Sequence, residues 1–163
     1  MTQQRPDERR AAELSRLMAA YEKDILKLCC LYLRDAGMAE DAAQETFFKA
    51  YRALDRFRGE CADKTWLVRI LINECKGVLR TRGRCVPLEQ DADEAAPETD
   101  GELYAALAAL DEKYRLPVTL HYIEGFRTSE IAGMMRLPEG TVKTRLRRAR
   151  EILRKELEGA CYA

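Results

Sequence analysis

The stretch TSEIAGMMRLPEGTVKTRLRRAREILRKEL, residues 128–157, decides the fold of the chain. It begins with a short segment of helical spacing that Thr128 is expected to cap and that ends near Met135. After a turn at 136–140, a longer segment repeats its apolar residues every three or four positions. This spacing predicts a second helix with one buried face, made of Val142, Leu146, Ala149, Leu153 and Leu157. The sequence therefore predicts a helix-turn-helix.

The other face of the longer helix is strongly basic. Seven Lys or Arg residues oppose only Glu151 between residues 143 and 155. In a helix-turn-helix, the start of the second helix enters the DNA major groove, where Arg and Lys donate hydrogen bonds to guanine. The alternative is a solvated basic helix in an ordinary bundle. Outward positions near the start are Thr141, Lys143, Thr144, Arg147 and Arg148, whereas Arg145, Arg150, Arg154 and Lys155 suit phosphate or solvent.

Two further helices are expected before this motif. Helical spacing of Leu103, Leu107, Leu110 and Tyr114 predicts the first of them. The second is expected to begin near Pro117, because proline is tolerated in a first helical turn, and to end before Gly125. The C-terminal part of the chain is therefore predicted to be a four-helix unit.

The charges of the 163 residues cancel, with 28 Lys and Arg against 28 Asp and Glu, but their distribution is uneven. Residues 1–86 carry 17 basic and 13 acidic side chains, a net charge of +4, and residues 103–163 carry 11 and eight, a net charge of +3. Residues 87–102 carry seven acidic and no basic side chains. With only nine glycines and five prolines in the chain, this predicts an all-α protein of two small domains joined by a flexible acidic linker.

The N-terminal domain is expected to consist of helices. Apolar residues between Leu14 and Tyr32 predict the first helix, which Gly37 is expected to interrupt, and a second helix is predicted from about Ala39 to Leu54. The outer face of the second helix combines acidic, amide and aromatic side chains: Asp41, Gln44, Glu45, Phe48 and Arg52. An exposed phenylalanine in such a stripe indicates a partner surface. The alternative is that Phe48 packs beneath the first helix.

A loop and a third helix provide a second basic surface. The loop spans residues 55–64 around Gly59, and the helix is predicted from about Thr65 to Arg80. One helical face carries Thr65, Arg69, Asn73, Lys76 and Arg80. With Phe57 and Trp66 beside it, this surface suits single-stranded nucleic acid, because cations follow phosphates and aromatic rings stack on bases. The alternative is a solvated helix face with a buried tryptophan.

Several classes of protein are disfavoured by the sequence. The first 14 residues lack the apolar core of a secretory signal, and no apolar run near the front is long enough for a membrane span. The six cysteines form no C-x-x-C pair, and a Ser–His–acid triad would have to combine Ser129 with His121, the only histidine. Phosphate-loop and nucleophile-elbow motifs are missing from the sequence. We expect no enzymatic activity, metal or cofactor, and a cytoplasmic location with reduced thiols.

Three strings resemble the extracytoplasmic-function (ECF) group of bacterial sigma factors, the dissociable specificity subunits of RNA polymerase. They are AEDAAQETFFKAYRALDRFRGE at 39–60, KTWLVRILINECKGVLR at 64–80 and EIAGMMRLPEGTVKTRLRRAREILRKEL at 130–157. The resemblance covers about residues 14–158 with both units in order. Its specificity rests on D-x-x-Q-E-x-F at Asp41–Phe47 together with G-T-V-K-T-R-L-x-R-A-R at Gly140–Arg150.

The resemblance implies three binding surfaces and no catalytic residue. The first binds the clamp coiled coil of the largest polymerase subunit and comprises Asp41, Gln44 and Glu45, with Phe48 on the same stripe. The second recognises and opens the −10 promoter element as single strand and comprises Phe57, Arg58, Gly59, Lys64, Asn73 and Arg80. The third reads the −35 element in the major groove through Thr141, Lys143, Thr144, Arg145, Arg147 and Arg148.

The resemblance also implies partners. They are promoter DNA, the clamp and flap of core RNA polymerase, and an anti-sigma factor, with no small-molecule substrate and no membrane insertion. The acidic linker corresponds to the segment that threads through polymerase between a domain at 1–86 and a domain at 103–163.

The chain departs from the family pattern in two places that matter. Cys61, Ala62 and Asp63 stand where members often have Ser-Ser-Phe, so the −10 base pocket is expected to differ. Arg136 stands where a glycine is common in the helix-turn-helix turn, and an arginine is strained there if the position takes a positive φ.

Two rival functions are open from the residues. A helix-turn-helix regulator independent of polymerase would place all function in residues 103–163. A redox sensor or enzyme using the cysteines would need an exposed thiol of low pKa or a bound metal.

Overall fold

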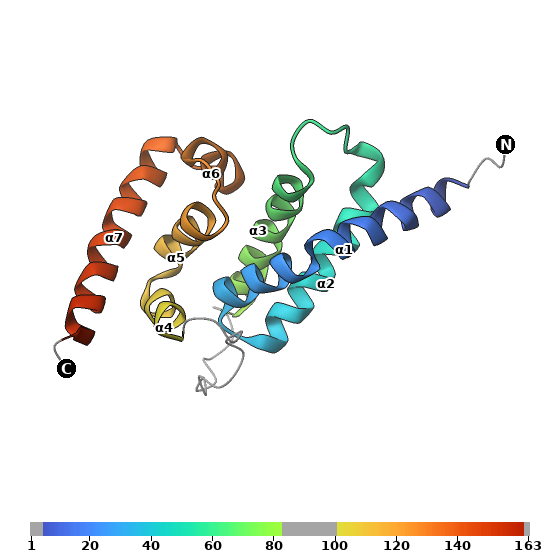
Figure 1. The fold of residues 1–163 in the computed structure, drawn as a ribbon. Coiled ribbons are helices and arrows are strands. Elements are labelled where there is room, and N and C mark those ends of the chain that lie inside the picture. The colour runs from blue at the N-terminus through green and yellow to red at the C-terminus, as the bar shows by residue number, and fades with distance from the viewer. Residues whose placement is uncertain (1–4, 83–100, 162–163) are drawn as a thin grey trace.

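The computed structural model describes residues 5–82 and 101–161, so the predicted linker lies outside the described residues except for its last two positions, which begin a helix. The described residues form helices and no strand, which confirms the all-α prediction. The N-terminal unit contains α1 (Pro6–Leu33), α2 (Ala36–Ala53), the short 3₁₀ turn η1 (Leu54–Arg56) and α3 (Asp63–Arg82). The C-terminal unit contains α4 (Gly101–Ala109), α5 (Glu112–Val118), the π-turn η2 (Thr119–Ile123), α6 (Thr128–Met135) and α7 (Glu139–Cys161) (Figure 1).

The break between α1 and α2 was predicted at Gly37. It occurs instead at Arg34 and Asp35. Arg34 takes a left-handed conformation with φ of 58°, and its N–H donates to the carbonyl of Cys30 at 2.9 Å. The Asp35 side chain then accepts the N–H of Met38 at 2.8 Å and caps α2. Because this aspartate starts the helix, Gly37 lies in the first turn of α2.

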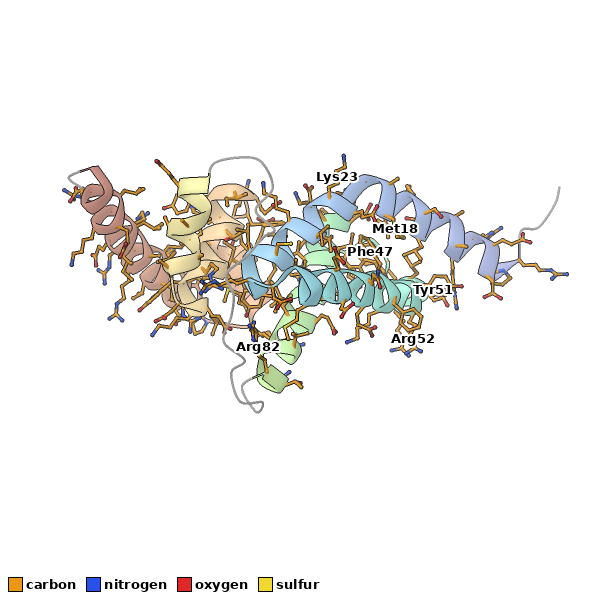
Figure 2. All side chains as sticks on the ribbon, turned by 90° about the horizontal axis from the view of Figure 1, so that it is seen from below. Met18, Lys23, Phe47, Tyr51, Arg52 and Arg82 are labelled. Carbon is orange, nitrogen blue, oxygen red and sulfur yellow. The ribbon has the colours of Figure 1, made fainter. Side chains whose placement is uncertain are left out.

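The core of the N-terminal unit lies among α1, α2 and α3. Leu17, Ile25, Leu71 and Ile72 are fully buried there, and Figure 2 shows Phe47 between α1 and α2. Helix α3 begins at Asp63, two residues before the predicted start, and its Thr65 is buried rather than on the polar stripe.

The predicted boundaries of the first two C-terminal helices are wrong. Leu110 and Asp111 separate α4 from α5, so Tyr114 belongs to α5 and not to the preceding helix. Pro117 lies inside α5 instead of at its start. Because proline has no N–H to donate, the regular ladder is interrupted there, and the chain continues as the wider turn η2. In η2 the N–H of Glu124 reaches back to the carbonyl of Thr119 at 3.1 Å.

Helices α6 and α7 form the predicted helix-turn-helix. Helix α6 covers the predicted residues, although Thr128 does not cap it: the N–H of Arg127 donates to Glu130 at 2.8 Å, and the Thr128 hydroxyl donates to Glu139 at 2.8 Å. Ala132 is buried, which lets α7 approach. On α7 the side chains of Val142, Leu146 and Ala149 are buried as predicted. Leu157 is 47% exposed, contrary to the prediction, because the core ends at Leu153 on this helix.

The two units pack against each other, which the sequence did not predict. Helix α1 contacts α4 and α5, and α3 contacts α6, as Figure 1 shows at the centre of the molecule. The buried apolar residues of both units form one continuous cluster. The candidate surfaces are therefore carried on one closed body in this structure.

Replacing Arg136 with glycine is expected to stabilise the protein. Arg136 has φ of 55° in the turn between α6 and α7. The sequence predicted backbone strain at Arg136 if this position takes a positive φ, and it does. A residue with a Cβ in the left-handed conformation costs about 1–2 kcal/mol, and glycine removes this strain. Because glycine loses more conformational entropy on folding, part of this gain is offset, and the free energy of unfolding is expected to rise by about 0.5–1 kcal/mol. Chemical denaturation measures it. Arg127→Gly is the control, because Arg127 has φ of −71°, and an equal gain in both variants would contradict the explanation.

Candidate nucleic-acid interface

The start of α7 borders a hollow of about 360 Å³. Its walls combine side chains of α7 with two from the first turn of α5, Lys113 and Tyr114. Because three of these side chains are cationic, the hollow suits an anionic group such as a DNA phosphate. The α7 residues that line it are Gly140, Thr141, Thr144, Arg145 and Arg148.

The sequence did not predict that Lys113 and Tyr114 line this hollow. The Lys113 ammonium lies 5.0 Å from the centre of the Tyr114 ring. The pKa of Tyr114 is below its usual value, because a hydrogen bond from Arg148 and the charge of Lys113 favour the phenolate. The break at Leu110 and Asp111 starts a new helix that presents Lys113 and Tyr114 beside α7, and no glycine or proline in the sequence marks this break.

The remaining predicted residues of α7 are open to solvent. Lys143 and Arg147 are exposed, and Lys143 forms an ion pair with Glu139 at 3.5 Å. Farther along the helix, Arg150 donates to the hydroxyl of Tyr122 at 2.8 Å. The basic face of α7 is thus a solvated surface, with Val142 and Leu146 buried on its other side.

The loop before α3 holds an aromatic pair. The rings of Phe57 and Trp66 are stacked, with centroids 4.4 Å apart and planes 12° from parallel. Arg58 and Gly59 are exposed, and Gly59 has φ of 71°, a conformation that glycine adopts without strain. Trp66 is half-buried, so one ring face packs on Phe57 within the protein.

Helix α3 continues this surface from the loop. Asn73 and Arg80 are exposed. Lys64 differs, because its ammonium pairs with Asp24 at 3.2 Å and with Glu124 of the C-terminal unit at 2.5 Å. Burial lowers the pKa of Lys64, but the hydrogen bonds and charges of these two carboxylates outweigh burial and raise it. Lys64 is therefore occupied within the protein.

The predicted stripe of acidic, amide and aromatic side chains on α2 lies on the outside of the molecule. Asp41 and Gln44 are exposed and Glu45 is half-buried. Phe48 is 48% exposed, which rules out the alternative that it packs beneath α1. The Arg52 guanidinium lies 4.4 Å from the centre of the Phe48 ring, and Figure 2 shows Arg52 on the side of α2 away from α1. An apolar ring and charged groups thus lie together on one exposed face.

Two of the described cysteines form a buried pair in the core. Cys29 and Cys75 are buried with their sulfur atoms 4.0 Å apart. A hydrogen bond with Cys29 and burial raise the pKa of Cys75, and burial raises that of Cys30. Residues 5–82 and 101–161 contain no group of three or more metal-ligating side chains that fits a metal ion. Over the same ranges, no helix is both long and apolar enough to cross a membrane.

His121 is an internal structural residue. It is half-buried, and its Nδ1 lies 2.8 Å from the carbonyl oxygen of Phe126. This contact links the turn η2 to the segment before α6. The partner of this ring nitrogen is thus a backbone carbonyl and not Ser129, the serine that a catalytic triad would require.

The fold and its surfaces define a helix-turn-helix protein with a second, basic helical domain. Family models for Sigma-70 region 2 and Sigma-70 region 4 match residues 17–85 and 100–153. The RNA polymerase sigma-H factor of Pseudomonas aeruginosa is 39% identical over 93% of this chain and 88% of its own. The ECF RNA polymerase sigma-E factor of Escherichia coli K12 is 36% identical over 84% and 82%.

Solved structures agree with these relatives. The sigma factor RpoE, in complex with the anti-sigma factor NepR from Bartonella quintana, matches with a TM-score of 0.79 and 27% identity over 90% of this chain and 97% of that chain. CnrH, in complex with the cytosolic domain of CnrY, shares the fold with a TM-score of 0.66 at 23% identity, over 90% and 88%.

The chain belongs to the ECF group of the sigma-70 family. It is a sigma factor for promoter-specific initiation of transcription by RNA polymerase, and members of this family are DNA-recognition subunits. A regulator independent of polymerase is not favoured, because the N-terminal half also matches a sigma-factor region.

Replacing Thr128 with valine is expected to lower the melting temperature in a pH-dependent way. The Thr128 hydroxyl and the Lys143 charge hold the pKa of Glu139 below its usual value of 4.5. A lowered folded-state pKa stabilises the protein above the unfolded pKa, and that contribution is lost as pH falls through the folded pKa. The difference between wild type and variant should therefore shrink below about pH 4.5. Thr128→Ser keeps the hydroxyl and is the control; a difference that does not change with pH would contradict the role of Glu139.

Proposed function

We propose that the chain binds core polymerase through α2, captures unpaired −10 bases with the loop before α3 and α3 itself, and reads the −35 duplex with α7. The observation that carries the proposal is that the two motif strings provide exposed faces on α2 and α7 of one chain. The working division remains a domain at 1–86, a linker at 87–102 and a domain at 103–163. The chain itself is proposed to catalyse no reaction.

Duplex recognition is assigned to the start of α7. Thr144 and Arg147 lie opposite the buried face of Val142 and Leu146, so they are the side chains that reach deepest into a groove. Lys113 and Tyr114 widen the cationic surface toward one DNA strand. The full set comprises Thr141, Lys143, Thr144, Arg145, Arg147 and Arg148.

Single-strand capture is assigned to the surface that begins at the Phe57–Trp66 stack. An aromatic pair beside the exposed Arg58 supports base stacking with phosphate contacts, and the exposed Arg80 lies farther along α3. Asn73 adds an amide that donates and accepts hydrogen bonds with a base edge. The loop Cys61–Asp63 carries a different side-chain set from many family members, so its preferred base is expected to differ.

Polymerase binding is assigned to Asp41, Gln44, Glu45 and Phe48. An exposed ring surrounded by carboxylate and amide groups suits the centre of a protein interface. The clamp of the largest subunit is the proposed partner of this stripe, and the flap is the proposed partner of the C-terminal unit. Because bacterial RNA polymerase acts in the cytoplasm, the chain is proposed to act there.

An anti-sigma factor is proposed as a further protein partner. The match to the sigma factor RpoE covers 90% of this chain, so it includes both helical units, and that protein was solved in complex with an anti-sigma factor. The similarity supports a comparable regulator for this chain.

Replacing Asp41 or Gln44 with alanine is expected to lower the affinity for core polymerase at least about fivefold, because loss of a central interface group costs more than about 1 kcal/mol. The test is run-off transcription with core polymerase and a promoter library, together with core-binding titrations. Glu22→Ala, an exposed carboxylate on α1, is the control. Wild-type initiation from no promoter in the library would overturn the proposed function, and unimpaired core binding by both variants would overturn the assignment of the stripe.

Arg147→Ala and Arg148→Ala are expected to have different effects on duplex binding. Arg147 lies on the open side of α7, so its loss should cost about 1–3 kcal/mol at one base pair. Arg148 lies in the hollow with Lys113, so its loss should weaken all sequences alike and reduce the salt dependence. Binding of the full chain to a set of single-base −35 variants measures both, with Lys23→Ala, an exposed lysine on α1, as the control. Identical sequence profiles for the two variants would contradict these roles.

A further inference from the structure

A cluster of four cations lies where α3 meets the turn between α6 and α7. Lys76 of α3 donates to the carbonyl of Met135, the last residue of α6, at 3.3 Å. Arg136 follows directly and is exposed, with its backbone in the left-handed conformation described above. Arg80, one helical turn beyond Lys76, and Arg145 of α7 complete the cluster, and the charges of all three arginines act on Lys76.

No carboxylate compensates the arginines of this cluster. Within residues 5–82 and 101–161, no Asp or Glu lies within ion-pair distance of Arg80, Arg136 or Arg145. Burial, together with the charges of these arginines, lowers the pKa of Lys76. Like charges around a half-buried lysine raise the free energy of the protein, and an anion among them relieves that cost. The cluster therefore has the electrostatics of an anion site.

Arg145 connects the cluster to the hollow of about 360 Å³ at the start of α7. It is half-buried, and it lines the hollow together with Lys113 and Arg148. A volume of this size is at the lower end of small-molecule sites, which span about 300–1,000 Å³. The combined surface thus offers space for a compact ligand beside cations from both units.

Closely spaced phosphates fit this charge pattern better than a single anion does. One carboxylate or one phosphate contacts one or two cations, whereas a chain of phosphates carries several negative charges within reach of the whole cluster. Arginine donates paired hydrogen bonds to phosphate oxygens, and three of the four cations are arginines. A DNA duplex is a poorer fit, because Lys76 and Arg145 are half-buried between helices.

From this arrangement we propose that the joint of α3, the α6–α7 turn and α7 binds a free oligophosphate, the chemistry shared by inorganic triphosphate and the nucleoside triphosphates. Lys76, Arg80, Arg136 and Arg145 hold the phosphates. A bound oligophosphate takes Arg145 away from DNA, so it competes with a duplex at the start of α7. The competition rests on the proposed −35 role of α7, whereas the binding of the phosphates does not.

Isothermal titration calorimetry of the full chain with inorganic triphosphate, without divalent cations, tests the site. Wild type should bind triphosphate more tightly than orthophosphate, because more negative charges meet the same cations. Arg136→Gly should weaken binding about fivefold or more, the effect of losing one charge-assisted contact. Because this substitution is expected to stabilise the fold, a loss of affinity is a loss of the site. Arg127→Gly, which removes an exposed arginine before α6, is the matched control.

Lys76→Gln extends the test to the half-buried part of the cluster. It should lower the affinity by a similar factor, with Lys23→Gln, exposed on α1, as its control, and melting temperatures show that each variant is folded. No binding of triphosphate by wild type, or equal losses in the site and control variants, would overturn the site. Binding that appears only after deletion of residues 89–100 would do the same, because the acidic segment would then be the occupant in the intact chain.

Titration with ATP in place of inorganic triphosphate separates the two sources of the ligand. Tighter binding of ATP identifies a nucleoside triphosphate whose nucleoside part contacts the hollow. Equal affinities identify the phosphate chain alone as the ligand.

Binding of a −35 duplex at matched ionic strength tests the competition. Inorganic triphosphate should weaken duplex binding by wild type and have less effect on Arg136→Gly. Triphosphate binding that leaves duplex affinity unchanged would contradict the competition. If the duplex does not bind even without triphosphate, the proposed function fails, while the calorimetry still decides the site.

Discussion

The guanidinium of Arg115 is the interaction on which both units depend. It is 4% exposed and donates to three carbonyl oxygens: Leu107 at 3.2 Å, Leu110 at 2.7 Å and Tyr32 at 3.0 Å. The Leu107 carbonyl lies in the last turn of α4 and also accepts the N–H of Leu110 at 3.2 Å, the Leu110 carbonyl follows that helix, and the Tyr32 carbonyl lies in the last turn of α1. One buried side chain thus completes two helix ends and joins the units. Burial lowers the pKa of Arg115, yet an arginine remains charged.

The helices that carry the proposed binding surfaces each bury one face in the core and expose the other to solvent. Helix α2 buries Phe47 while it exposes Phe48 at the next position, so one helix provides both core packing and the proposed partner surface. Helix α7 does the same, with Val142 and Leu146 inside and its cations outside. The frame carries the proposed polymerase-binding face on α2 and the two proposed DNA-binding faces on α3 and α7. Because each of these helices both packs in the core and carries a proposed binding face, a chain of 163 residues has room for all three proposed faces.

The helix-turn-helix was predictable because local signals mark it. Thr128, Met135 and Pro138 delimit α6 and the turn, and the apolar period of α7 is regular. The boundary of α4 was missed because Leu110 and Asp111 contain neither glycine nor proline, and Pro117 was misread because proline both starts and interrupts helices. Lys64 was placed on a DNA surface, whereas its pairing with Glu124 depends on residues 60 positions apart in sequence. Such contacts between units have no local pattern.

The Phe57–Trp66 stack gives the protein a built-in optical reporter. Trp66 is the only tryptophan of the chain, so all indole fluorescence comes from the entrance of the proposed single-strand surface. A base that inserts between the two rings would change the environment of one face of that indole. Movements of Phe57 against Trp66 are therefore visible as changes of indole fluorescence in the unlabelled protein, when the excitation avoids the seven tyrosines.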